Sequence, residues 1–309
     1  MELQKKSTIM PLLAALLVMA LWGSLFPMIK VGYAAFEINT AHIPSILLFA
    51  GLRFTVSGIV LVSACSVRAK RLELPTKSNV GYLFLGALAA IILHYSFTYI
   101  GLALGEGSKS AIIKQVGFLF LSCFAFLFDK SDKFSVAKVI AGILGFCGII
   151  ATAMDGTGLH FAIGDLILLL ASACSAVSTV IAKRATQHVS PVTYTAYTQL
   201  IGGVFLLAAG LTLGGRIPHV DLKAILVFAY ICTASICAYV LWNSLLRSGS
   251  ISKLSIIKFT EPLFAVIFSG LILGEKILRL SYLAALLLLL AALLVEHQPW
   301  RKHHERNGL

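Results

Sequence analysis

The sequence predicts an all-α integral membrane protein with ten transmembrane helices, arranged as two inverted five-helix repeats. Three observations lead to this prediction. The chain of 309 residues is 59% hydrophobic and only 12% charged, which is more apolar surface than a water-soluble domain can bury. Its apolar residues gather into ten long stretches, and two distant segments repeat each other with a lysine in the same place.

Each of the ten stretches is long enough to cross the roughly 30 Å hydrocarbon layer of a bilayer as a helix. Short separators with turn-forming residues lie between them, such as GEGS after Leu104 and MDGTG after Ala153. No separator is long enough to hold a soluble domain. The expected spans are Ile9–Val31, His42–Ser66, Val80–Leu104, Ser108–Phe128, Ser135–Ala153, Phe161–Lys183, Pro191–Leu213, Leu222–Leu246, Leu254–Leu273 and Leu280–Glu296.

Lysine and arginine are unequally divided between the two ends of these spans. Ten spans place both termini on one side, and that side holds 16 of the 25 basic residues, whereas the opposite side holds five. Because cytoplasmic loops are enriched in Lys and Arg, we expect both termini in the cytoplasm and the chain in the cell membrane. The basic residues punctuate the apolar runs and form no polar domain, so the net charge of +12 does not indicate nucleic-acid binding.

The repeat is clearest around two lysines. AIIK, which ends at Lys114, matches SIIK, which ends at Lys258, at an offset of 144 residues, and the register holds without gaps from Tyr95/Tyr239 to Ala141/Ala285. Each unit holds five spans, an odd number, so the second unit is predicted to lie upside down relative to the first. The predicted divisions are a first repeat at 1–154, a second at 155–298 and a basic cytoplasmic tail at 299–309.

An inverted repeat has a mechanical consequence. Two halves of like fold and opposite orientation can exchange conformations, which opens a central site first to one side of the membrane and then to the other. The sequence therefore predicts a transporter with a central cavity, walled mainly by spans 1, 3, 4, 6, 8 and 9. A passive channel or facilitator for small solutes is the alternative.

Three motifs resemble those of a known family. EPLFAVIFSGLILGE (Glu261–Glu275), LWGSLFP (Leu21–Pro27) and GLRF (Gly51–Phe54) resemble motifs of the EamA-like family of the drug/metabolite transporter superfamily. The resemblance covers nearly the whole chain. It implies a secondary carrier of small organic metabolites, such as an amino acid or a related carboxylate, that works as an exporter. The first repeat departs from the family pattern, because Gly117-Phe118 stands where a proline is usual and FDKSDK replaces Leu-Gly-Glu.

Lys114 and Lys258 are the first candidate substrate contacts. Each lies a few residues inside its span, roughly 6–10 Å below opposite membrane faces at the rise of an α-helix. Both are expected near helix N-termini, where the helix dipole adds positive potential, so together with Gln115 they suit a carboxylate or phosphate group. Alternatively both lysines snorkel to the nearer interface, or Glu261 neutralises Lys258.

Two further charges are candidates for coupling or gating. Glu261 lies inside span 9 and is followed by Pro262, which weakens the helix because it lacks a backbone N–H. A protonatable group beside a helix break could couple proton movement to transport, or it could be a fixed partner of Lys258 or Arg53. Arg53, about ten residues into span 2, is expected to be structural or gating, as the resemblance implies.

Aromatic and amide side chains complete the predicted site. Spans 3 and 8 carry matched faces, and aromatic walls with a few polar tips are typical of small-molecule sites, although the same groups also serve as packing contacts between helices. The residues assigned to this face are Tyr95, Tyr99, Tyr239, Asn243, Trp242 and Trp22.

Enzyme, metal and cofactor motifs are not found in the sequence. It has no HExxH, GxSxG, P-loop or metal-ligand spacing. We therefore predict no catalytic residues, no metal and no cofactor. The expected partners are a small-molecule substrate, protons where transport is coupled to them, and the lipid bilayer, with the protein a monomer or a homodimer.

Overall fold

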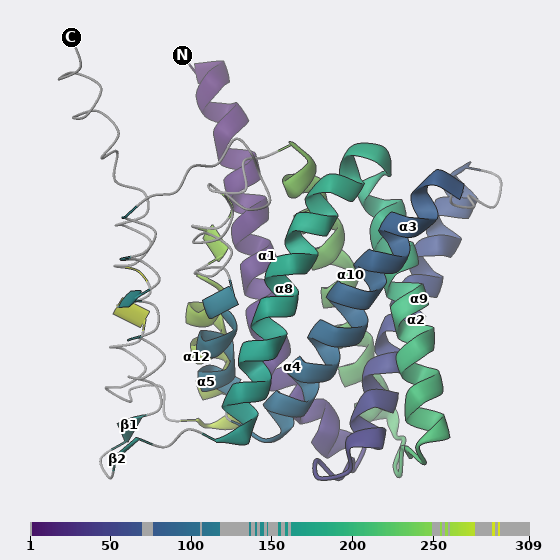
Figure 1. Cartoon of the computed structure of the whole chain (residues 1–309), viewed down its shortest axis with the longest axis vertical. Coiled ribbons are helices and arrows are strands. Elements are labelled where there is room, and N and C mark those ends of the chain that lie inside the picture. The colour runs from purple at the N-terminus through teal and green to yellow at the C-terminus, as the bar shows by residue number, and fades with distance from the viewer. Residues whose placement is uncertain are drawn as a thin grey trace.

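Helices make up most of the described chain. The computed structural model describes residues 2–69, 77–105, 107–117, 162–248 and 260–275, together with 136, 140, 143, 144, 147, 154, 155, 158, 159, 254, 257, 258, 286, 287 and 290. The elements are α1 (Glu2–Ala35), α2 (Ile43–Ala69), α3 (Lys77–Gly86), the π-helix η1 (Ala87–Leu93), α4 (His94–Ala103), α5 (Gly107–Lys114), β1 (Met154–Asp155), β2 (Gly158–Leu159), α8 (Ile163–His188), α9 (Pro191–Thr212), α10 (Leu222–Ser248) and α12 (Glu261–Leu273) (Figure 1).

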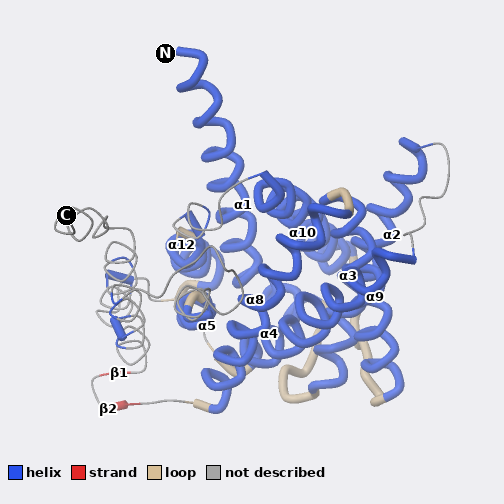
Figure 2. The backbone as a smooth tube through the Cα atoms, turned by 45° about the horizontal axis from the view of Figure 1, so that its top comes forward, coloured by secondary structure: helices blue, strands red, loops and turns tan. Residues whose placement is uncertain are grey.

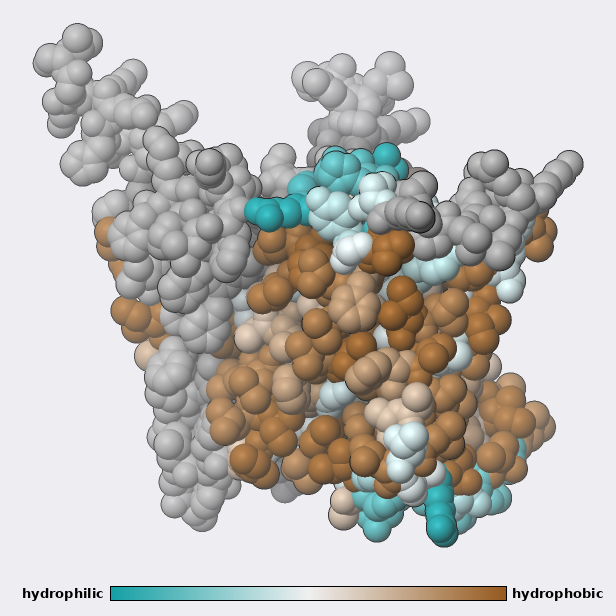
Figure 3. All heavy atoms as spheres, turned by 45° about the vertical axis from the view of Figure 1, so that its right-hand side comes forward, coloured by the Kyte–Doolittle hydropathy of each residue, from teal (hydrophilic) through white to brown (hydrophobic). Residues whose placement is uncertain are grey.

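Six helices of the described chain are long and apolar enough to cross a membrane. They are Met10–Ala35, Ile43–Val67, Ser78–Ala103, Ile163–His188, Pro191–Thr212 and Leu222–Arg247. These correspond to predicted spans 1, 2, 3, 6, 7 and 8. One face of the molecule shows a broad hydrophobic belt with hydrophilic residues gathered at its two ends, as a lipid-facing surface requires (Figure 3).

The remaining predicted spans are described only in part. Spans 5 and 10 and the second half of span 4 lie outside the described residues apart from isolated positions. In span 9 the structure describes Leu254, Ile257, Lys258 and Thr260 and then α12, an apolar helix of 13 residues that begins at Glu261. The separator predicted after span 5 contains a short antiparallel pair, β1 and β2, with Met154 opposite Leu159, and the fold class is all-helical as predicted.

Predicted span 3 is not a uniform α-helix. The π-helix η1 lies between α3 and α4, and such wide turns occur frequently at functional sites. Span 1 also differs from its prediction, since α1 extends past both expected ends and contains Pro11 and Pro27. Membrane helices tolerate internal prolines because neighbouring helices and side chains satisfy the freed carbonyl groups.

Corresponding helices of the two halves lie together at opposite edges of the bundle. α2 packs along α9 at one edge, and α5 packs against α12 at the other (Figures 1 and 2). Between these edges, α1 contacts α10 and α12, whereas α8 contacts α4 and α5. The sequence repeat relates α1 to α8, α10 to α4 and α12 to α5. The contacts of α1 with α10 and α12 therefore correspond to the contacts of α8 with α4 and α5.

Glycines allow α2 and α9 to approach closely. A Cβ at Gly51 would lie 2.6 Å from Leu207 Cα, and a Cβ at Gly203 would lie 2.6 Å from the carbonyl carbon of Phe54. Residues further along α2 contact residues nearer the start of α9, so the two helices run antiparallel. Small residues at such an interface bring backbones into van der Waals contact, the main source of helix association in lipid.

An aromatic cluster lies at the end of the bundle opposite the N-terminus of α1. Phe49 lies 5.6 Å from Tyr33, 5.6 Å from Phe36 and 5.8 Å from Phe228 between ring centroids. Tyr99 lies 6.2 Å from both Tyr33 and Phe49. We call these five residues the aromatic plug. It joins the C-terminal end of α1 to α2, α4 and α10.

Candidate substrate-binding cavity

A cavity between the two halves is lined by nearly every long helix of the described chain. With its open mouth included, its empty volume is about 900 Å³. Its polar and aromatic lining residues are Trp22, Phe26, Arg53, His94, Tyr95, Thr98, Lys114, Gln115, Ser175, Ser178, Thr179, Tyr194, Thr198, Tyr239, Trp242, Asn243, Lys258 and Glu261.

Two repeat-related tyrosines meet in this cavity. The Tyr239 hydroxyl donates a 2.6 Å hydrogen bond to the Tyr95 hydroxyl, and the two residues are 144 positions apart. That separation is the offset at which the sequence repeats. Trp22 from α1 packs beside them, with ring centroids 5.5 Å from Tyr239 and 5.2 Å from Trp242. Matched positions of the two halves therefore build one shared wall.

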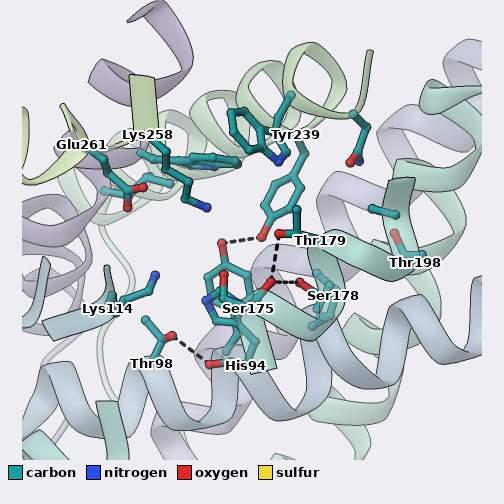
Figure 4. A pocket seen from close by; sticks show the side chains of 18 of the residues that line it. His94, Thr98, Lys114, Ser175, Ser178, Thr179, Thr198, Tyr239, Lys258 and Glu261 are labelled. Carbon is teal, nitrogen blue, oxygen red and sulfur yellow. Dashed lines mark hydrogen bonds between the residues drawn. The ribbon is translucent and has the colours of Figure 1, made fainter. Parts of the chain in front are cut away.

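The two repeated lysines point into this cavity from opposite sides (Figure 4). Lys114 Nζ lies 5.1 Å from the centre of the Phe26 ring and 5.9 Å from that of Tyr95. Lys258 Nζ lies 4.7 Å from Trp22 and 5.1 Å from Trp242. Aromatic faces stabilise buried ammonium groups by cation–π attraction. Aromatic rings thus contact both amines at the cavity wall.

Each lysine adjoins a break in its helix. α5 ends at Lys114, where the Gln115 N–H turns back to the Ile112 carbonyl at 3.1 Å. Near Lys258, the Thr260 N–H bonds to the Ile257 carbonyl at 2.9 Å before α12 begins. The expectation that both lysines lie near helix N-termini was wrong for Lys114, because its helix stops at that residue. Its charge instead faces the negative end of the α5 dipole.

Ser172 of α8 forms hydrogen bonds with the backbone on both sides of the break after Lys114. Its Oγ donates a 2.6 Å hydrogen bond to the Lys114 carbonyl and accepts one from the Gly117 N–H. A backbone amide is needed for the second bond, and there is no room for a side chain, since a Cβ at Gly117 would meet the Ser172 backbone. This contact explains physically why glycine suits position 117 in this chain.

Glu261 is the first residue of α12 and is 3% exposed. An acidic side chain is favourable there because the helix N-terminus carries positive potential. Its charge attracts both Lys114 and Lys258. Its Oε2 accepts no hydrogen bond from any described residue. Gly23 of α1 lets α12 approach, since a Cβ there would lie 3.0 Å from the Glu261 carbonyl oxygen.

Arg53 is fully buried at the cavity wall. Its Nε donates to Ser235 Oγ at 2.9 Å, and its terminal nitrogens donate to Ser235 and to the Tyr99 hydroxyl. Its guanidinium carbon lies 4.7 Å from the centre of the Phe54 ring. Among described residues its hydrogen-bond partners are neutral hydroxyl groups. Within the described part of the chain, no carboxylate accepts a hydrogen bond from the Arg53 guanidinium.

The structure brings ten of the eleven sequence-predicted site residues to one cavity. They are Trp22, Arg53, Tyr95, Lys114, Gln115, Tyr239, Trp242, Asn243, Lys258 and Glu261. Tyr99 is not among the lining residues, but it bonds to Arg53 and its ring packs 6.0 Å from that of Tyr95, both of which line the cavity. Asn243 donates a 2.8 Å hydrogen bond to Thr195 Oγ1, which fixes its amide group.

Comparison with known proteins identifies the family. The model of the EamA-like transporter family matches residues 9–154 and again residues 162–296. The chain belongs to the EamA-like transporter family.

Relatives of this EamA-like transporter carry transporter names. It is 32% identical to the "uncharacterized transporter YvbV" of Bacillus subtilis over 290 residues, which cover 91% of this chain and 89% of that protein. It is 26% identical to a "probable amino-acid metabolite efflux pump" of Salmonella typhimurium over 290 residues, 89% and 91% of the two chains. A solved crystal structure superposes with a TM-score of 0.68, covering 93% and 96% of the two chains, at 16% identity, which concerns the fold alone.

Sequence reasoning missed the hydroxyl face that α8 contributes to the cavity of this EamA-like transporter. Ser175, Ser178 and Thr179 line it, and the latter two donate to the Ser175 carbonyl at 2.8 and 2.9 Å. Hydroxyl groups three or four residues apart inside an apolar span share one helix face, so this signal was present in the sequence. Tyr194 and Thr198 of α9 also line the cavity, although span 7 was not expected to form a wall.

Proposed function

We propose that this EamA-like transporter is a secondary active exporter of small organic metabolites that bear a carboxylate, such as amino acids or their relatives. The observation that carries the proposal is the single cavity to which both halves contribute matched residues, with Tyr95 and Tyr239 hydrogen-bonded to each other. A site shared by two repeats can be exposed first to one side of the membrane and then to the other. The protein would bind its substrate and release it unchanged.

The architecture that suits this function is ten transmembrane helices in two inverted five-helix repeats. Two matches to the family model and the antiparallel packing of α2 on α9 support it. With both termini in the cytoplasm of the cell, the aromatic plug would lie toward the outside. The cavity would then be closed on that side.

The aromatic plug favours a carrier over a channel. Four of its five rings are at most 7% exposed, and Tyr33 Oη also donates a 3.3 Å hydrogen bond to the Tyr99 carbonyl. A channel needs a continuous path through the membrane, whereas a carrier is closed at one end at every stage of its cycle. The names of relatives as efflux pumps of amino-acid metabolites support the outward direction and the substrate class.

In this proposal Lys114 and Lys258 bind the acidic group of the substrate from the two sides of the cavity. The aromatic contacts of both amines at the cavity wall favour this role over snorkelling. Glu261 supplies either the proton-coupling site or a fixed counter-charge to the lysines. Its unpaired Oε2 within the described chain supports the first role, because a carboxylate that exchanges a proton needs an oxygen that is not held by a donor.

Flux measurements on the purified protein in liposomes test the proposal. Vesicles are loaded with a panel of amino acids and small carboxylates, and efflux is followed with and without an imposed proton gradient. A saturable efflux of one class at carrier rates is the expected result, accelerated by the gradient if Glu261 exchanges protons. Conductance at channel rates would favour a passive pore, and the absence of flux for every compound would contradict the proposal.

A further inference from the structure

Three cationic side chains line the cavity. Arg53 comes from α2, Lys114 ends α5, and Lys258 precedes α12. Two of them contact the Tyr95 ring, whose centre lies 5.4 Å from the Arg53 guanidinium carbon and 5.9 Å from Lys114 Nζ. Segments far apart in the sequence thus direct three positive charges toward one space.

The acidic side chains of the described lining do not balance these charges. Glu261 is the one carboxylate among the described lining residues, so these residues carry an excess of two positive charges when all four groups are ionised. Aromatic faces compensate a cation only weakly, far less than a carboxylate does. An uncompensated charge in a low-dielectric site is costly, so an arrangement of this kind is best stabilised by an anionic ligand.

The positions of the charges indicate more than one anionic group. Arg53 donates to Ser235 of α10 and Tyr99 of α4. Lys114 and Lys258 face each other across the open part of the cavity (Figure 4). A single carboxylate held between the two amines would leave the guanidinium without a negative partner.

We propose that the substrate carries two anionic groups, as a dicarboxylate or a phosphorylated carboxylate does, with one group between the lysines and the other on the Arg53 side. This inference rests on the proposed carrier function and narrows its substrate class. A zwitterionic amino acid with one carboxylate would bring no net negative charge to the site. Arg53 thereby becomes a charge-recognition residue, in place of the structural or gating role that the family resemblance implies.

Tryptophan fluorescence in lipid nanodiscs gives a direct binding test. The sequence holds three tryptophans, and replacing Trp300 by Phe leaves Trp22 and Trp242, which both line the cavity. The probes are dicarboxylates of three to six carbons, a phosphorylated carboxylate, the monoamide of each dicarboxylate and the zwitterionic amino acid of equal length. Each monoamide keeps the shape of its dicarboxylate and removes one charge.

The best dianion is expected to bind about ten- to a hundredfold more tightly than its monoamide, as one charge-assisted contact predicts. Lys114→Gln should shrink that ratio several-fold, and Arg53→Lys, which keeps the charge but shortens its reach, should weaken dianions more than monoanions. Lys223→Gln is the matched control, because Lys223 is exposed on α10 and absent from the lining. A control variant that changed the ratio as Lys114→Gln does would overturn the inference.

Equal affinities for dianion and monoamide in the unmodified cavity would overturn the inference, as would a preference for the zwitterion or no dianion binding at millimolar concentration. Binding in nanodiscs requires no translocation. Liposome efflux of an amino acid without dianion binding would therefore reject the dianion and leave the carrier intact. Dianion binding without efflux of any compound would reject the carrier alone.

Discussion

Replacing Lys258 by glutamine gives the sharpest test of the proposed site. Its amine lies 4.7 Å from the Trp22 ring and 5.1 Å from the Trp242 ring, and the residue is 7% exposed. Glutamine keeps a polar side chain of similar length and removes the charge. Lys114→Gln makes the same change on the opposite side of the cavity.

The expected magnitude follows from two terms. A hydrogen bond to a charged group contributes about 1.5–3 kcal/mol, so the loss of one substrate contact should raise the half-saturation concentration for an anionic substrate about ten- to a hundredfold. Removing the charge also removes cation–π contacts worth about 0.5–2 kcal/mol, but it relieves the cost of burying an ammonium group. The two stability terms oppose each other, so the melting temperature should change little.

Efflux from liposomes measures the half-saturation concentration, and fluorescence-detected melting measures stability. If both amines contact one bound group, the double variant should be less impaired than the product of the two single effects, because contacting residues are not additive. Lys223→Gln controls for the loss of a positive charge elsewhere. Unchanged transport and binding in both single variants and the double variant would refute the reasoning and leave snorkelling as the explanation.

Two other predictions concern stability and are tested by melting in detergent. Gly51→Ala should destabilise the protein by about 1–3 kcal/mol because the new Cβ would overpack against Leu207. Gly81→Ala is the control: a Cβ there has no atom within 4 Å, so this change should be neutral or slightly stabilising. Equal effects of the two changes would show that α2 and α9 are not closely packed. The Asp165 side chain is 3% exposed and accepts hydrogen bonds from Lys109 at 2.7 Å and from the Ala162 N–H at 3.0 Å. Asp165→Ala should therefore lower the free energy of unfolding by about 3–5 kcal/mol. A decrease below about 1 kcal/mol would indicate a solvent-exposed ion pair.

The membrane class, six of the spans, the repeat and most of the predicted residues that line the cavity can be read from the sequence alone. Apolar run length and the near absence of charge suffice for the spans because lipid allows few ways to satisfy a backbone. The lysines at 114 and 258 were identifiable because an intramembrane charge is costly and is usually retained for function. The hydroxyl face of α8 could also have been found, since its spacing is helical.

The way in which the spans and the site residues come together depends on tertiary packing. The break after Lys114 depends on Ser172, which lies 58 residues away and bonds to the Lys114 carbonyl, and no local pattern reports such a contact. The π-helix η1 in span 3 and the position of Tyr99 outside the cavity lining likewise follow from packing between distant helices. The excess of positive charge in the described lining follows only from the fold, which brings Arg53 of α2 to the same cavity as the two lysines, because electrostatic interaction depends on distance through space and not on separation along the chain.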